Sequence, residues 1–343
     1  MSKPIVVVGS YNVGLFLKGQ RLPQKGETVT AEFYEGPGGK GSNQAIAAAM
    51  LGGRVQFVGC LGDDQYGRDA RRLYTELGID QRHIFTEPGI HSGISVILID
   101  AHGDNLISVA LGANNCLAPQ HIDQAAEAIG SAAVLACQLE GPLATTAYAL
   151  GKARQLGVTT VLDPAPATAL PDEVYRNTDI ITPNESEAQT LTGIVPDTLR
   201  SATAAGRALL ARGVRIAVVK LGERGCLCVT PEGEHYVPAI RVNAVDVTGA
   251  GDAFAGGLAV ALAEGKPMLA ALEFATCVAA LSVTKVGVVN ALPSRDEADR
   301  LYRNARLVAE LVNCNACQVR CEEQTCPHLA PGRRDVTGLL SPN

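Results

Sequence analysis

The sequence predicts an α/β protein in which a parallel sheet is covered by helices on both faces and a small antiparallel sheet is added to it. Short runs of β-branched residues alternate with longer helical patterns along nearly the whole chain. The predicted strands are apolar throughout, as in strands buried on both faces of a parallel sheet. Two segments punctuated by proline and glycine break this alternation, and they predict the antiparallel addition.

The predicted elements follow one another in strand–helix order. The strands are predicted at Ile5–Gly9, Val55–Val58, Val134–Leu139, Thr159–Asp163, Asp179–Thr182 and Ile216–Leu221. The helices are predicted at Asn43–Leu51, Tyr66–Leu77, Ile122–Ile129, Leu143–Gln155, Glu185–Leu191, Ser201–Arg212, Asp252–Leu262 and Asp296–Asn313. The two irregular segments span about residues 11–35 and 93–112. The first contains an alternating piece at residues 28–33, and the second contains a hairpin turn at residues 101–105.

The composition indicates a folded chain and disfavours several function classes. Hydrophobic residues make up 47 % of the 343 residues and charged residues 19 %, which is enough for a sizeable core. The net charge of −6 disfavours general binding to nucleic-acid phosphates. The longest uncharged apolar stretches, such as residues 253–263, are about half as long as a membrane-spanning helix. The N-terminus resembles a strand rather than a signal peptide, so we expect a cytoplasmic protein without nucleic-acid or membrane partners.

Six of the ten cysteines are scattered along the chain, mostly within apolar runs. They are Cys60, Cys116, Cys137, Cys226, Cys228 and Cys277. Free cysteine behaves as a small buried hydrophobe in a reducing compartment. We therefore expect these six in the core.

Polar residues follow directly on several predicted strands. They are Asn12, Glu140, Asp163, Asn184 and Glu187. Since ligands bind at the carboxyl ends of parallel strands, these side chains are expected to converge on one crevice. The alternative is that each is only a helix cap or a turn residue.

A glycine-rich turn at residues 246–251 leads into the apolar helix that contains Asp252. Free backbone amides and the positive end of the helix dipole make such a turn an anion site. A carboxylate at this point is placed to deprotonate a hydroxyl that attacks a phosphoryl group, while the amides hold the developing charge. The alternative is that Asp252 only caps the helix.

A second glycine-rich turn, at residues 36–45, leads into an alanine-rich helix. Its glycines let the backbone approach a polar ligand, and Asn43 is placed to bind hydroxyl groups. The alternative is a flexible loop with a cap. Neither turn fits the dinucleotide fingerprint or the P-loop, which disfavours an NAD-dependent enzyme.

Four motifs stand along the chain: G-G-K-G-S-N-Q-A at residues 38–45, D-P-A-P-A at 163–167, P-N-E-S-E at 183–187 and T-G-A-G-D at 248–252. Together they resemble the ribokinase branch of the PfkB sugar-kinase family. They occur in the family's order and spacing over roughly residues 4–310. The resemblance implies a Rossmann-like kinase domain over residues 1–312. It also implies that the two irregular segments form a β-lid, through which homodimers assemble.

The resemblance implies a role for each matching residue. Asp252 matches the catalytic base, and the backbone amides of Ala250, Gly251 and Asp252 match the anion hole, with Gly249 directly before them in the catalytic turn. The sugar-binding positions are Asn12, Gly14, Gly38, Gly39, Lys40, Asn43, Glu140 and Asp252. The nucleotide-binding positions are Asn184, Lys220, Gly222, Gly225, Gly251 and Thr276. Glu187 matches an indirect magnesium ligand. Asp246 and Thr248, with carbonyls near Val283 and Val286, match a monovalent-cation site.

These positions imply a kinase that uses ATP and Mg²⁺, is activated by K⁺, and phosphorylates the primary hydroxyl of a pentose, D-ribose first. Two positions depart from the pattern. Ala291 stands where the cation site has a serine-type residue, and Gly14 stands where ribokinases carry an aspartate. Losing that acceptor is expected to weaken ribose binding or to shift specificity. The alternatives are deoxyribose, another pentose, a ketohexose, a nucleoside, or a sugar-binding sensor without catalysis.

Four further cysteines form a cluster in an extension over residues 313–343, most of which the family does not explain. They are Cys314, Cys317, Cys321 and Cys326. If the preceding helix continues, the first three share one stripe and are small core residues. Four thiolates at this spacing are also compatible with a structural zinc site. Disulfides are a third alternative, disfavoured in the cytosol.

Overall fold

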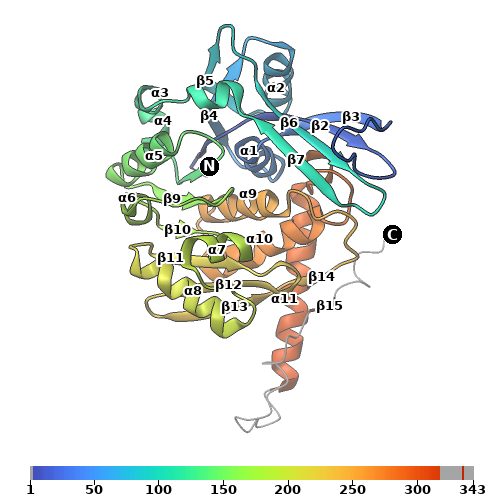
Figure 1. The fold of residues 1–343 in the computed structure, drawn as a ribbon. Coiled ribbons are helices and arrows are strands. Elements are labelled where there is room, and N and C mark those ends of the chain that lie inside the picture. The colour runs from blue at the N-terminus through green and yellow to red at the C-terminus, as the bar shows by residue number, and fades with distance from the viewer. Residues whose placement is uncertain (1–2, 317–333, 336–343) are drawn as a thin grey trace.

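The computed structural model describes residues 3–316 and 334–335, with side chains described up to residue 307 (Figure 1). Its main sheet has the strand order β13-β12-β11-β10-β9-β8-β1-β4-β5. From β5 to β11 all neighbours pair in parallel, and β12 and β13 form an antiparallel edge. The strands are β1 (Ile5–Val8), β4 (Val55–Gly62), β5 (Asp80–Glu87), β8 (Val134–Cys137), β9 (Thr159–Leu162), β10 (Ile180–Ile181), β11 (Ile216–Lys220), β12 (Gly225–Thr230) and β13 (Gly233–Pro238).

Helices cover both faces of this sheet, which confirms the predicted fold class (Figure 1). Strand β1 shows why, because Ile5 and Val7 belong to one apolar cluster and Val6 and Val8 to the other. The first face carries α1 (Lys40–Met50), α2 (Gln65–Glu76), α9 (Ala250–Ala263), α10 (Met268–Ser282) and α11 (Arg295–Ala316). The second carries α3 (Pro119–Gln124), α4 (Ala126–Ser131), α5 (Leu143–Gln155), α6 (Asp172–Arg176), α7 (Glu185–Thr192) and α8 (Leu199–Ala211).

Shorter elements connect these layers. The 3₁₀ helices are η1 (Gly112–Cys116), η2 (Gly222–Arg224) and η3 (Val289–Ala291). Strand β14 (Ile240–Arg241) pairs in parallel with β15 (Arg334–Asp335). Within the described ranges, the helices are too short or too polar to cross a membrane.

A four-stranded lid stands at one edge of the molecule, in the order β3-β2-β6-β7 (Figure 1). Its strands are β2 (Asn12–Lys18), β3 (Glu32–Gly38), β6 (Gly93–Ile99) and β7 (Asn105–Ala110). The outer pairs are antiparallel as expected, but the central pair of β2 and β6 is parallel, so the lid is a mixed sheet. The strand expected at residues 28–33 begins only at Glu32 and runs on to Gly38.

Several predicted boundaries were wrong for identifiable reasons. The strand expected at residues 179–182 is reduced to Ile180–Ile181, because the Asp179 carboxylate accepts a hydrogen bond from the Thr160 amide. The helix expected at residues 122–129 is two helices that meet at Ala125. Strands β5, β12 and β13 and helix α10 were not predicted. Strand β5 has no apolar run, and α10 is apolar on all sides and so lacks the amphipathic period.

The scattered cysteines lie where the sequence predicted, with one exception. Five of the six are buried free thiols, and Cys116 is partly exposed.

Close packing of α1 against α9 brings the two glycine-rich turns together. A Cβ atom on Gly256 would lie 2.6 Å from the Ala47 Cβ, so only glycine allows the helices to approach this closely. Both helices begin after a glycine with positive φ, which is 86° at Gly39 and 76° at Gly249. The site is built where these two helix starts meet the ends of the strands.

Candidate active site

Asp252 lies in the first turn of α9 and is buried. One carboxylate oxygen accepts a hydrogen bond from Asn43 Nδ2 at 2.8 Å, and the other accepts from Gln44 Nε2 at 3.3 Å. The N-cap of α9 is Gly249, and no side chain caps this helix. The interpretation of Asp252 as a simple cap is therefore wrong.

The surroundings of Asp252 hold its pKa well above the usual range, at about 6. Burial is the largest cause, and the neighbouring charges of Asp163 and Glu140 act in the same direction. The Lys40 ammonium and the hydrogen bond from Asn43 oppose the shift. A carboxylate with this pKa is ionised at neutral pH and is still basic enough to accept a proton.

Glu140, which follows β8, occupies the start of α1. Its Oε2 atom accepts hydrogen bonds from the Lys40 amide at 2.7 Å and from Ser10 Oγ at 2.6 Å. Burial of the Lys40 side chain opposes its charge, but the negative charges of Asp252, Asp163, Glu140 and Glu187 together raise its pKa above the usual range. Strand-end residues and the α1 start thus converge around one ammonium group.

Asn12 and the residues of the lid base form the outer wall of this crevice. Asn12 is buried, and its Oδ1 accepts a hydrogen bond from Asn114 Nδ2 at 2.9 Å. Gly38 and Gly39 pass directly over it, and a Cβ atom on Gly39 would lie 2.7 Å from the Asn12 nitrogen. Gly14 lies two residues along β2, on the same face as Asn12.

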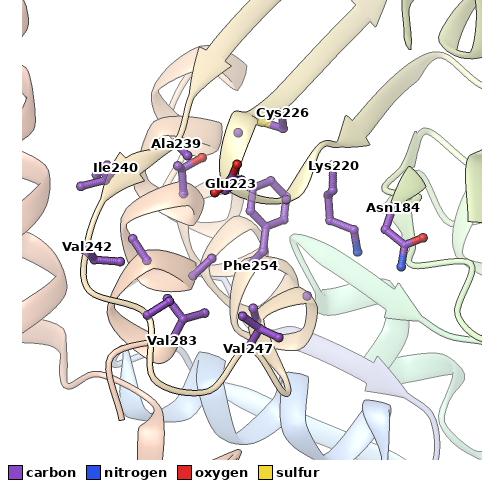
Figure 2. A pocket seen from close by; sticks show the side chains of 18 of the residues that line it. Asn184, Lys220, Glu223, Cys226, Ala239, Ile240, Val242, Val247, Phe254 and Val283 are labelled. Atoms are coloured by element: carbon purple, nitrogen blue, oxygen red, sulfur yellow. The ribbon is translucent and has the colours of Figure 1, made fainter. Parts of the chain in front are cut away.

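A cavity of about 370 Å³ adjoins the other side of α9 (Figure 2). All six residues predicted to bind the nucleotide line it: Asn184, Lys220, Gly222, Gly225, Gly251 and Thr276. Figure 2 shows Lys220 and Asn184 on one side of the cavity and Ile240 and Val242 on the other. The cavity therefore has a polar end, beside the start of α9, and an apolar end.

Asn184 and Glu187 form a capping box at the start of α7. Asn184 Oδ1 accepts from the Glu187 amide at 2.9 Å, and Glu187 Oε2 accepts from the Asn184 amide at 2.8 Å. The capping interpretation is thus confirmed for this pair, and Asn184 also lines the cavity. Burial raises the pKa of Glu187, with the Lys220 ammonium opposing.

The loop before α9 is tied to the loop after α10 through Asp246. Its two carboxylate oxygens accept hydrogen bonds from the amides of Thr248 and Gly287, each at 2.9 Å. Burial opposes ionisation, but these bonds hold the pKa of Asp246 below its usual range. The Val283 carbonyl accepts from the Val245 amide at 2.7 Å, while the side chain of Val286 is exposed.

Comparison with known proteins identifies the family. A model of pfkB family carbohydrate kinases matches residues 2–295. The chain belongs to the pfkB family. It is 37 % identical over 306 residues to a ribokinase of Haemophilus influenzae, covering 89 % of this chain and 100 % of that one. It is 38 % identical over 295 residues to a deoxyribokinase of Salmonella typhimurium, covering 85 % and 96 %.

The structural comparison agrees with the family assignment. A ribokinase of Arabidopsis thaliana complexed with ribose and ATP matches with a TM-score of 0.84 and 31 % identity, covering 88 % of this chain and 99 % of that chain. The chain is therefore a carbohydrate kinase of the ribokinase branch, a phosphotransferase with an alcohol group as acceptor.

Sequence reasoning missed several polar residues of this pfkB-family site. Gln44 donates to both Asp163 and Asp252, and Gln138 Nε2 donates to Gln44 Oε1 at 2.6 Å. Asn114 bonds both the backbone of Tyr11 and the side chain of Asn12. Gln44 stands directly after Asn43 in the second glycine-rich turn, which was a usable signal. Gln138 and Asn114 carry no comparable local pattern.

The cysteine cluster falls largely outside the described residues. Cys314 lies in α11, which continues to Ala316, and Cys317, Cys321 and Cys326 lie beyond the described ranges. The three alternatives for this cluster, including structural zinc, therefore stay predictions.

Proposed function

We propose that the protein transfers the γ-phosphoryl group of ATP to the primary hydroxyl of a pentose, with D-ribose, giving D-ribose 5-phosphate, as the leading substrate. The observation that carries this proposal is the position of α9. Its start separates a buried carboxylate, Asp252, from the polar end of a cavity of about 370 Å³. An acceptor hydroxyl at Asp252 and a phosphate chain in the cavity would meet at the free amides of one helix.

In this arrangement Asp252 accepts the proton of the attacking hydroxyl. The amides of Gly251 and Asp252 stabilise the negative charge on the phosphoryl group, because they lie at the positive end of the α9 dipole. The third predicted amide, that of Ala250, donates to the Val247 carbonyl at 3.3 Å. Gly249 adopts the left-handed conformation that starts this turn. Asn43 orients Asp252 through the hydrogen bond of 2.8 Å.

The cavity fits ATP with its phosphates at the polar end. Asn184, Lys220 and Gly251 lie there, and the apolar end, with Thr276 nearby, offers a surface for the base. Gly222 and Gly225 form the turn after β11 and allow close approach of the backbone.

The acidic character of the site fits a magnesium ion. The charges of four carboxylates act on Lys40, and carboxylate oxygens are ligands that Mg²⁺ prefers. Within the described ranges no three Asp, Glu, His or Cys side chains form a metal-binding group, and the indirect role proposed for Glu187 does not need one. The ion, when bound, neutralises charge on the phosphates.

We also propose activation by K⁺ at the loops joined by Asp246. The Asp246 carboxylate, with Thr248 and the carbonyls of Val283 and Val286, would hold the ion next to the start of α9. The charge of Asp246 and its bonds to both loops support this assignment. Equal rates in potassium and in tetramethylammonium buffers would contradict it.

The pentose is expected against Asn12, Lys40, Asn43 and Glu140, below the lid. A second substrate, 2-deoxy-D-ribose, is favoured by the lid residue Gly14, which provides no hydrogen-bond acceptor for a sugar hydroxyl. The ring of Phe16 lies over Gly14 instead and stacks on Tyr34 with ring centroids 4.6 Å apart. The Salmonella relative named a deoxyribokinase supports the same alternative.

The direct test measures ADP release with MgATP alone and then with each of D-ribose, 2-deoxy-D-ribose, other pentoses, a ketohexose and a nucleoside. Sugar-dependent release that is fastest with D-ribose is the expected result. Faster release with 2-deoxy-D-ribose would establish the second substrate. No release with any sugar, together with sugar binding, would identify a sensor and refute the kinase proposal.

We also propose that the protein forms a homodimer and that it is located in the cytoplasm. Exposed apolar side chains on the lid edges, Phe33, Leu106, Ile107 and Val109, support a homodimer formed through the lid. Sedimentation analysis of the Ile107→Asp variant tests this, since a dimer should dissociate. The free cysteines support a cytoplasmic location.

A further inference from the structure

Lys220 stands at the end of β11, on the polar side of the nucleotide cavity (Figure 2). Its side chain is only 12 % exposed, and its Nζ atom lies 2.8 Å from Asp163 Oδ1, in a carboxylate that is 3 % exposed. This is a buried ion pair, and such a pair contributes little net stability because both charges lose their hydration. A stabilising role alone therefore does not account for its position at a cavity wall.

The ammonium also lies beside the start of α9. A Cβ atom built on Gly251 would be 3.4 Å from Lys220 Nζ. An ammonium has three donors, and within the described part of the chain only Asp163 accepts from this one. Two donors thus remain beside the amides of Gly251 and Asp252.

We propose that Lys220 is a catalytic residue that binds the phosphoryl group during transfer, and that Asp163 is the positioning residue that holds its ammonium at the start of α9. The ammonium and the α9 amides then surround the same negative charge from two sides. Such donors act most strongly on the transition state, where that charge is redistributed. The inference rests on the proposed kinase function and adds a catalytic group to it.

Asp163 connects this cation to the base. Its second oxygen accepts from Gln44 Nε2 at 3.0 Å, and the same nitrogen lies 3.3 Å from Asp252 Oδ1. The side-chain amide of Gln44 therefore fixes both carboxylates. Asp163 lies on the phosphoryl side of the proposed reaction, and Asp252 lies on the hydroxyl side. Gln138 holds Gln44 in this orientation.

The test separates catalysis from structural pairing by removing both charges. Lys220→Met alone leaves Asp163 buried without its partner, so loss of activity in this variant has two explanations. In Lys220→Met/Asp163→Asn neither charge remains, and the melting temperature should return close to that of the wild type. We expect kcat to stay about 100-fold lower in this double variant, the size of effect seen when one charge-stabilising donor is removed.

Nucleotide binding without sugar provides a readout that does not depend on identifying the sugar. In the double variant the Kd for MgATP should rise about tenfold or more, from loss of a charge-assisted hydrogen bond, while the Kd for adenosine stays unchanged. Lys220→Gln, which keeps a donor for Asp163, should show the same selective loss and serves if the double variant does not fold. A wild type that phosphorylates no sugar would refute the kinase proposal and leave this binding test valid.

A matched control is the surface pair of Lys152 and Asp123, whose charged atoms lie 2.7 Å apart on α5 and α3. Lys152→Met/Asp123→Asn should change neither kcat nor nucleotide affinity.

Asp163→Asn alone should move the acidic limb of the kcat profile to lower pH, because the Asp163 charge helps to raise the pKa of Asp252. Recovery of wild-type kcat in the Lys220/Asp163 double variant, or equal weakening of MgATP and adenosine, would overturn the proposal.

Discussion

Helices α1 and α9 both begin after a glycine with positive φ, and they differ in what their first amides bind. At α1 the Lys40 amide donates to the Glu140 carboxylate at 2.7 Å, and the Ser42 amide donates to the Ser10 carbonyl at 2.8 Å. At α9, within the described residues, the amides of Gly251 and Asp252 have no acceptor. One helix start is thus filled by the protein's own carboxylate, and the other is the one proposed above to bind the phosphoryl group.

This difference assigns the two ends of the site to different tasks. Free amides at the start of a helix attract negative charge, whichever molecule provides it. Glu140 satisfies α1 permanently, so that end forms a fixed wall to which neutral hydroxyl groups can bind. The unfilled start of α9 suits a charge that appears only during reaction. The predictions below alter one end at a time.

The largest effect is expected at α9, for Asp252→Asn. Turnover should fall by about 10²–10⁴-fold, since the variant lacks the group that accepts the hydroxyl proton. The MgATP affinity should be unchanged, because the cavity lies on the other side of the helix. Steady-state kinetics and nucleotide binding measure the two quantities. A variant that keeps more than about a tenth of the wild-type kcat would mean that another group is the base.

The same substitution should stabilise the fold. Burial raises the pKa of Asp252 from 3.8 to about 6, so ionisation of this group costs stability above the folded-state pKa. Asp252→Asn removes that cost, and the Asn43 amide can rotate to pair with the new one. The free energy of unfolding at pH 8 should rise by about 1–3 kcal/mol. The difference from the wild type should shrink as the pH falls through 6 and vanish below about 4.

The next effect is the pH dependence of the wild type. Since Asp252 accepts a proton only when ionised, kcat/KM should decline below about pH 6, by about tenfold per pH unit. Glu140 takes no part in the proposed proton transfer, but its charge helps to raise the pKa of Asp252, so Glu140→Gln should move this limb to slightly lower pH without removing it. A limb near pH 4 in the wild type would show that Asp252 is not buried as described.

At the start of α1, the variant that corresponds to Asp252→Asn at α9 is Glu140→Gln. The amide side chain can still accept one hydrogen bond but loses the charge that faces the helix dipole and Lys40. We expect KM for the sugar to rise about fivefold, which corresponds to about 1 kcal/mol, with kcat nearly unchanged. A fall in kcat as large as that of Asp252→Asn would remove the distinction between the two helix starts.

Sequence patterns located both helix starts but not the connections between them. The glycine-rich turns are local motifs, and the resemblance to the family supplied six of the residues that line the cavity. The role of Gln44 does not, because it depends on Asp252, 208 residues away, and on the close packing of α1 and α9. The parallel pairing of β2 with β6 escaped prediction for the same reason, since it joins two distant segments.

The smallest effect concerns the lid above the α1 side of the site, at Gly14. An aspartate there would restore a hydrogen-bond acceptor for sugar hydroxyls. Its Cβ atom would lie 2.6 Å from the far end of the Phe16 ring, so the ring must move and part of its stacking on Tyr34 is lost. We therefore expect only about a fivefold rise in the ratio of kcat/KM for D-ribose to that for 2-deoxy-D-ribose, near 1 kcal/mol.

A matched control for Gly14→Asp is available on the neighbouring strand. Gly36 pairs with Gly14 across the lid, and a Cβ atom on Gly36 meets no atom within 4 Å. Gly36→Asp therefore adds the same charge to the lid without displacing Phe16. If both variants change the ratio equally, general electrostatics is the cause. If the wild type already uses D-ribose efficiently and Gly14→Asp leaves the ratio unchanged, a group other than a lid carboxylate recognises the sugar hydroxyls in this protein.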